Sequence, residues 1–148
     1  MKKLLFILWQ CTWGLPATLV GLGFFIANRK CPHRMYRSCI DTQWNHTGGL
    51  SLGLFIFTPP DSQKNADLIR VHEYGHCIQS LLLGPLYLFA VGLPSYLWAN
   101  LPALRKLRRK KGLSYYAVWP EKQANALGEW ATGEKSVGMA LPVRHKSS

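Results

Sequence analysis

The sequence is poor in acidic residues and in charge overall. Its 148 residues contain only seven Asp and Glu, and charged residues of both signs make up 17%, below the roughly 25% usual for soluble domains. Together with 48% hydrophobic residues, this composition excludes a disordered chain, a coiled coil and a collagen-like repeat. The length fits a single domain.

Cysteine pairs at a metal-binding spacing are also missing. The four cysteines (Cys11, Cys31, Cys39 and Cys77) form no CxxC pair, and the cluster Cys31, His33 and Cys39 matches no common zinc module. We therefore expect either free thiols or one disulfide.

The positive charge is abundant, and its positions are informative. Eighteen Lys and Arg give a formal net charge of +11, which is typical of a nucleic-acid binder or a membrane protein. Much of this charge flanks two apolar stretches, at residues 29–37 and 105–111. We therefore expect a lipid bilayer as a partner and no nucleic acid. The sequence indicates no oligomeric state.

The first apolar stretch, residues 4–27, contains no charged residue. It is long enough to cross a hydrocarbon core, and we predict one uncleaved transmembrane helix. A signal peptide fits poorly because the run is too long and lacks an A-x-A-like cleavage site. The larger cluster of positive charge follows the run and places that side in the cytoplasm.

The middle of the chain shows strand and helix signals. Residues 33–58 are predicted to form a β-hairpin, because a turn-forming stretch precedes a short β-prone run. A helix is predicted over 62–83, with Asp61 or Ser62 as its cap and Gly84-Pro85 as its end.

The remaining segments complete a mainly α, membrane-embedded helical fold. Residues 84–104 are apolar but interrupted by Gly and Pro, which predicts either one kinked crossing or a re-entrant segment. A helix over 118–128 begins near Pro120 and ends at Gly128. Residues 133–148 are predicted to be a loose tail.

The chemistry is indicated by the motif H-E-x-x-H at residues 72–76. Two histidines four residues apart on a helix share one face and can both bind Zn²⁺. Glu73 lies between them, in the position of the general base that deprotonates a zinc-activated water in metalloproteases. The motif predicts zinc as the cofactor, with His72 and His76 as ligands.

A catalytic zinc needs a third protein ligand. Glu121 is the strongest candidate because it begins a helix whose face also carries Asn125, an amide able to orient a zinc-bound histidine. The alternative for Glu121 is a carboxylate that only stabilises the helix N-terminus. The other acidic and histidine candidates are Asp41, Asp61, Asp67, Glu129, Glu134 and His145.

The two motifs together, HEYGH at 72–76 and EKQAN at 121–125, resemble the gluzincin pattern of the CAAX prenyl protease and heat-shock membrane protease group. The resemblance implies that His72, His76 and Glu121 bind zinc and that Glu73 is the base. The group has Asp where this chain has Asn125. Residues 79–95 also resemble small bacterial membrane proteins with the same motif, which implies a bacterial cell membrane.

The predicted function is therefore a membrane-embedded zinc metallopeptidase that acts on a peptide or membrane-protein substrate. Tyr115, Tyr116 and His46 are candidates for stabilising the oxyanion. In zincins an edge strand pairs with extended substrate, and residues 50–57 are placed to do so or only to cover the helix. The alternative function is a non-enzymatic membrane protein, or a complex subunit, with a structural zinc site.

The basic clusters also predict where the site lies. Both clusters favour the cytoplasm, and Glu121 must reach the same metal as the two histidines. We therefore expect residues 84–104 to return to the side they entered from, with the active site at the cytoplasmic interface.

Overall fold

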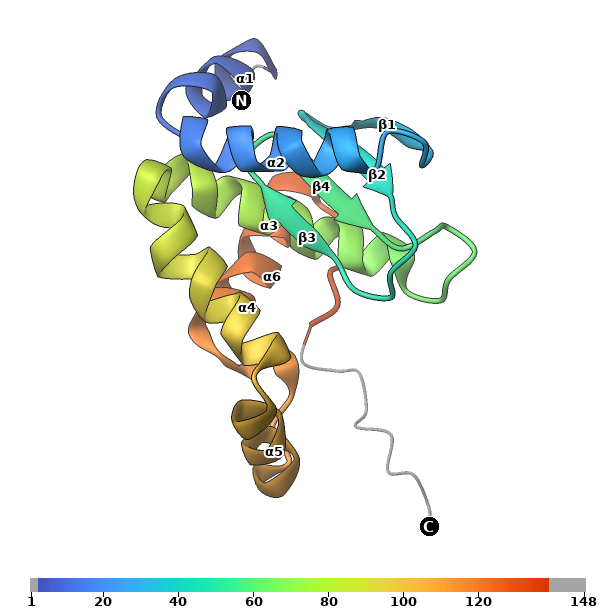
Figure 1. Cartoon of the computed structure of the whole chain (residues 1–148), viewed down its shortest axis with the longest axis vertical. Coiled ribbons are helices and arrows are strands. Elements are labelled where there is room, and N and C mark those ends of the chain that lie inside the picture. Colours follow the sequence, from blue (N-terminus) through green and yellow to red (C-terminus); the bar gives the residue numbers. More distant parts are fainter. Residues whose placement is uncertain (1–2, 139–148) are drawn as a thin grey trace.

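The computed structural model describes residues 3–138. These residues form six α-helices and one four-stranded mixed sheet, so the mainly α fold class is confirmed (Figure 1). The helices are α1 (Lys3–Thr12), α2 (Leu15–Ala27), α3 (Ala66–Leu83), α4 (Leu93–Asn100), α5 (Pro102–Lys111) and α6 (Trp119–Thr132). The strands are β1 (His33–Tyr36), β2 (Cys39–Gln43), β3 (Leu50–Leu52) and β4 (Phe55–Thr58).

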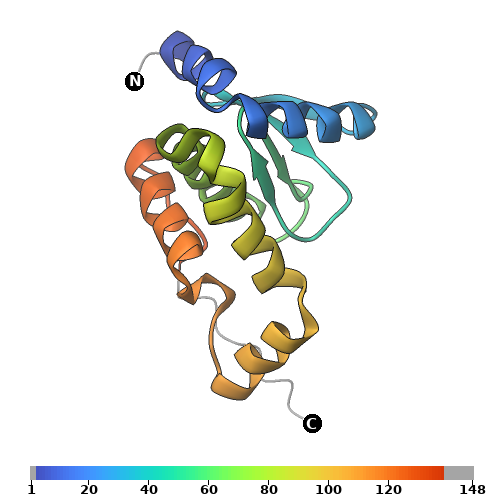
Figure 2. The same cartoon turned by 60° about the vertical axis from the view of Figure 1, so that its left-hand side comes forward.

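The sheet lies between two helices. In β4, Phe55 and Phe57 pack against phenylalanines of α2, whereas Ile56 joins a core cluster with Tyr74 and Cys77 of α3. This alternation follows from the two-residue period of a strand. Helix α6 packs along α3, beside the HEYGH segment. Figure 2 shows α3 and α6 side by side, with α2 across the sheet.

The sheet is larger than the predicted hairpin over 33–58. Its order is β1-β2-β4-β3, with two antiparallel hairpins joined by a parallel pairing of β2 with β4. Two tight turns create the hairpins, at Arg37 with φ 54° and at Gly53 with φ 63°. The predicted β structure over 33–58 is present, but it has four strands instead of one hairpin, because the parallel contact joins segments that no local turn signal relates.

The predicted single helix over 4–27 is also wrong, because the chain bends between α1 and α2. The ring of Pro16 conflicts with the carbonyl of the residue four positions earlier, and α1 ends at that residue, Thr12. The buried Gln10 fixes the bend: its amide donates to the Cys77 carbonyl at 2.9 Å and accepts from Ser80 at 3.0 Å.

No single helix within residues 3–138 has both the length and the apolar composition of a membrane crossing. Two pairs of neighbouring helices have the required length and apolar composition when each pair is taken together, but each pair is sharply bent. The angle is 97° between α1 and α2, and 119° between Ala66–Leu86 and Leu88–Asn100. The second bend lies at the start of residues 84–104, where the chain changes direction before α4. The chain bends after η1 (Gly84–Leu86), whereas the π-helical segment η2 (Leu88–Gly92) continues into α4, and Pro102 starts α5.

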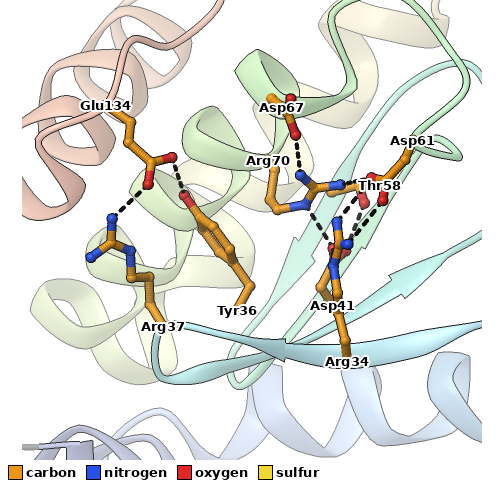
Figure 3. Close-up of polar contacts among 9 residues, drawn as sticks. All are labelled: Arg34, Tyr36, Arg37, Asp41, Thr58, Asp61, Asp67, Arg70 and Glu134. Carbon is orange, nitrogen blue, oxygen red and sulfur yellow. Dashed lines mark hydrogen bonds and ion pairs between the residues drawn. The ribbon is translucent and has the colours of Figure 1, made fainter.

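Helix α3 begins at Ala66, four residues later than predicted, and neither Asp61 nor Ser62 caps it. The Asp61 carboxylate instead accepts hydrogen bonds from Arg34 on β1 and Arg70 on α3. Arg70 is buried and also binds the buried Asp41 at 2.8 Å (Figure 3). This network fixes the first turns of α3 on the sheet, directly before the HEYGH segment.

A second polar contact holds the end of α6. Arg37, in the β1–β2 turn, donates to the Thr132 carbonyl at 2.9 Å and to Glu134 at 2.6 Å. Tyr36 donates to the other oxygen of Glu134 (Figure 3). Of the predicted tail 133–148, residues 139–148 lie outside the described residues.

Candidate metal centre

The site forms where α3 and α6 approach closely. Gly75 has no room for a Cβ, which would overlap the backbone of Ala124, and a Cβ on Gly128 would overlap the Val71 carbonyl. Glycine thus lets the two helix backbones touch. The prediction that Gly128 ends α6 is wrong, because the helix continues to Thr132. Gly128 lies inside the helix, where it packs against Val71 of α3.

His72, His76 and Glu121 meet across this contact. Oε2 of Glu121 lies 3.0 Å from Nε2 of His72 and 3.3 Å from Nε2 of His76. One ligand atom from each of the three residues lies within 4.8 Å of the others, and all three side chains are buried. This group can hold a metal ion.

Both histidines are oriented by a hydrogen bond from the other ring nitrogen. Nδ1 of His72 donates to Oδ1 of Asn125 at 2.8 Å, and Nδ1 of His76 donates to Oε1 of Gln79 at 2.7 Å. Gln79 is itself held by its amide, which donates to the Pro120 carbonyl. Because Nδ1 is the donor to these amides, Nε2, which faces Glu121, is the ring nitrogen available to a metal ion.

The pKa values of His76 and Glu121 reflect the contact between these two side chains. Burial alone lowers the pKa of His76, but its hydrogen bond with Glu121 and the charge of that carboxylate outweigh burial and raise the pKa to about 9. Burial raises the pKa of Glu121, yet the two histidines hold it far below its usual range. The carboxylate therefore stays ionised, as a metal ligand must.

One atom of the site is left without a partner. Oε1 of Glu121 is buried and accepts no hydrogen bond from residues 3–138. A buried carboxylate oxygen without a partner is costly, and a cation between the three side chains would supply the missing interaction. Two imidazoles and one carboxylate form a donor set typical of catalytic Zn²⁺.

Glu73 lies beside the three ligands and touches the sheet. Gly49, just before β3, has no room for a Cβ because Glu73 fills that space. Glu73 is buried, and burial raises the pKa of its carboxyl above the ordinary value. A raised pKa favours a general base, because the proton it takes is held and later released near neutral pH.

A cavity of about 580 Å³ opens over Glu73 and His76. Its walls are mainly apolar and come from α2, β3, η2, α4 and Tyr115. Strand β3 is an edge strand and borders the cavity. Tyr87 donates to the Ser51 carbonyl in this strand at 3.0 Å, and Gly49, directly before the strand, lies against Glu73.

The three predicted oxyanion candidates differ in position. Tyr115 lines the cavity, and burial together with the charges of Glu121 and Glu73 raises its pKa well above the ordinary value. The ring of Tyr116 lies edge-on to His72 at 5.0 Å. His46 is exposed in the β2–β3 connection against Trp44 and does not line the cavity, so we drop it as a candidate.

The other residues considered as metal ligands have different partners. Asp41, Asp61 and Asp67 bind Arg70, Glu129 accepts from Ser136, and His145 lies outside the described residues. Cys77 is a free thiol whose Sγ lies 3.2 Å from that of Cys39 in the core.

Sequence reasoning overlooked Gln79 and Gly49. Gln79 could have been found from its position three residues after His76, on the same helix face. Gly49 gave no signal, because its role depends on a contact between segments distant in sequence.

Comparison with protein-family models, with curated proteins and with solved structures finds no match for this chain.

Proposed function

We propose that the chain is a zinc-dependent metallopeptidase. The observation that supports this most is the pairing of the His72, His76 and Glu121 group with Glu73 and a cavity that reaches both Glu73 and His76. The likeness of the HEYGH and EKQAN segments to gluzincins agrees with this arrangement. Peptide hydrolysis at a metal requires these parts: metal ligands, a general base beside them and a space for the substrate.

Each residue has a defined task in this proposal. His72, His76 and Glu121 hold Zn²⁺, which when bound lowers the pKa of water and polarises a carbonyl. Glu73 takes a proton from the attacking water and then gives it to the leaving amine. Asn125 and Gln79 keep the two imidazoles in place. Tyr115, which lines the cavity, would donate a hydrogen bond from its hydroxyl to the developing oxyanion.

The proposed substrate is an extended peptide or a segment of a membrane protein. The mainly apolar walls of the cavity suit apolar side chains. Backbone pairing with the edge strand β3 would place the peptide beside Gly49 and Glu73.

We further propose that the chain sits in a bacterial cell membrane with the site at the cytoplasmic interface. The bent helix pairs and their exposed apolar side chains support the membrane location, and the basic segments beside them are the argument for the cytoplasmic side. The exposed apolar side chains include Leu4, Leu8, Trp9, Leu19, Phe24 and Ile26 on α1 and α2, and Leu86, Phe89, Leu93 and Tyr96 between η1 and α4.

The alternative is a structural zinc site without activity. Structural sites are normally closed by four protein ligands, and within residues 3–138 only three such residues come together. The cavity at His76 and Glu73 leaves a direction open for water, which favours catalysis.

Two variants test the proposal, with zinc content and hydrolysis of fluorescently labelled casein as measurements in detergent. Glu73→Gln should keep one zinc per chain and lose hydrolysis. Glu121→Ala should lose both. A wild type that binds zinc but leaves casein and apolar model peptides intact would favour the structural alternative. Unchanged zinc binding in Glu121→Ala would exclude Glu121 as a ligand.

A further inference from the structure

Helix α5 carries positive charge that the rest of the structure does not neutralise. Five of its basic side chains are exposed: Arg105, Lys106, Arg109, Lys110 and Lys111. Within residues 3–138, no side chain of α5 takes part in an ion pair. The acidic residues are engaged elsewhere, and residues 74–120 contain none.

The charges converge on a small hollow at the end of α5. Arg105, Arg108 and Arg109, with Gly112 and Leu113, line a cavity of about 270 Å³. Arg108 forms its inner wall, with the guanidinium stacked on the rings of Trp98 and Tyr115 at 5.2 and 5.3 Å. Its Nε is buried without a hydrogen-bond partner. Three arginines around one hollow suit a phosphate group.

Exposed leucines adjoin this basic hollow. Leu113 lines it and is 42% exposed. Leu101, one turn before Arg105, is 43% exposed, and α4 also exposes Leu93 and Tyr96. Figures 1 and 2 show α5 at the end of the molecule opposite α1 and α2, below α4. A partner that offers both phosphate and an apolar phase fits this surface, whereas a nucleic acid offers only the first.

We propose that the hollow on α5 binds the phosphate headgroup of an anionic phospholipid, with the neighbouring leucines in contact with its acyl chains. Basic side chains beside a membrane segment are attracted to anionic lipid in this way. Arg108 would lie between the bound lipid and Tyr115, because its guanidinium stacks on that ring, and Tyr115 lines the cavity over Glu73. The lipid-binding proposal does not depend on the peptidase proposal.

The test measures binding of short-chain lipids to the full chain in neutral detergent. The probes are dioctanoyl phosphatidylglycerol and dioctanoyl phosphatidylcholine, followed by tryptophan fluorescence because Trp98 borders the site. We expect saturable binding of the anionic lipid only. Arg105→Gln/Arg109→Gln should weaken it about 30-fold, from the usual contribution of two basic residues near an anionic surface.

Two control variants separate charge from folding. Arg105→Lys/Arg109→Lys keeps both charges and should bind within a few-fold of wild type. Lys30→Gln/Lys64→Gln removes two exposed charges elsewhere and should also bind nearly as wild type. Thermal melting verifies that each variant is folded.

Several results would overturn the proposal. They are equal affinity for the two lipids, unchanged binding in the Gln variant, and equally lost binding in the folded Lys variant. Tighter binding of a single-stranded oligonucleotide than of phosphatidylglycerol would assign the hollow to nucleic acid instead.

Discussion

Single residues in this protein act through the space they leave as well as through their functional groups. Gly49→Ala places a methyl group where Glu73 now lies. Because the Glu73 side chain must then move, casein hydrolysis should fall at least about tenfold, since a small misplacement of a reacting group is costly. Zinc content should stay at one per chain.

Gly48 provides the matched control for this variant. It neighbours Gly49, and a Cβ on it would meet no atom within 4 Å, so Gly48→Ala should leave hydrolysis unchanged. Full activity in Gly49→Ala would show that the contact with Glu73 is not needed.

Asn125 should tune metal affinity through His72. Its Oδ1 accepts from Nδ1 of His72 at 2.8 Å, and removal of such a partner typically lowers metal affinity 10–100-fold. We expect that loss for Asn125→Ala in competition with a chromophoric zinc chelator. Asn125→Asp keeps the acceptor and should bind at least as tightly as wild type. Equal affinity in all three proteins would contradict the role.

The residues at the metal centre were largely predictable from the sequence. The four-residue spacing of His72 and His76 depends only on helix geometry, and the same holds for Glu121 with Asn125. Gly49 and the orphan oxygen of Glu121 were not predictable, because both depend on which segments meet in space.

At the scale of elements, the contact between α3 and α6 sets the site. Gly75→Ala forces the helix backbones apart at Ala124. Overpacking typically costs about 1–3 kcal/mol, and the better helix propensity of alanine returns up to ~1 kcal/mol of this. We expect a melting temperature a few degrees lower and weaker zinc binding, because Glu121 moves away from the histidines.

Gly23, inside α2, gives a control with the same change of side chain. A Cβ there meets no atom within 4 Å, so Gly23→Ala should be neutral or stabilising by up to ~1 kcal/mol. If both variants melted alike, close packing at Gly75 would not matter.

The stability of the contact between α3 and the sheet should depend on pH. Hydrogen bonds from Arg34, and further from Arg70, lower the pKa of Asp61 although burial opposes them. A lowered pKa in the folded state means that Asp61 stabilises the fold fully above about pH 4 and loses this effect as the pH falls further. Asp41 and Asp67 share Arg70 with it.

Asp61→Asn tests this attachment by thermal melting at a series of pH values. The loss at pH 7 should be at most about 1 kcal/mol, because Asp61 is half-exposed. The difference from wild type should shrink as the pH falls below about 4. A difference that stays constant with pH would point to packing instead of charge.

The elements were predicted less well than the residues, for physical reasons. The apolar composition of residues 4–27 masked the break at Pro16, although α1 ends where that proline requires. Gly128 was predicted to end a helix, but it is glycine because the Val71 carbonyl leaves no room for a side chain. The order of the strands depends on a parallel pairing that only the complete fold creates.

For the whole molecule, the membrane proposal predicts an orientation. We expect Ser62 and Lys111 to face the cytoplasm, because the basic segments flank the apolar helices. Single cysteines at these two positions, in a chain with Cys11 and Cys31 changed to Ser, should label with an impermeant maleimide only after cells are opened. Labelling of one of them in intact cells would place α5 and α3 on opposite sides.

The distance along the chain between the ligands has a consequence for biosynthesis. Glu121 follows His72 by 49 residues, and α6 is fastened by contacts at Thr132 and Glu134. At roughly 5–20 residues per second, the ribosome adds Glu121 several seconds after His72. A nascent chain therefore has no complete metal site until α6 emerges and docks, so any hydrolytic activity is withheld until synthesis has passed that helix.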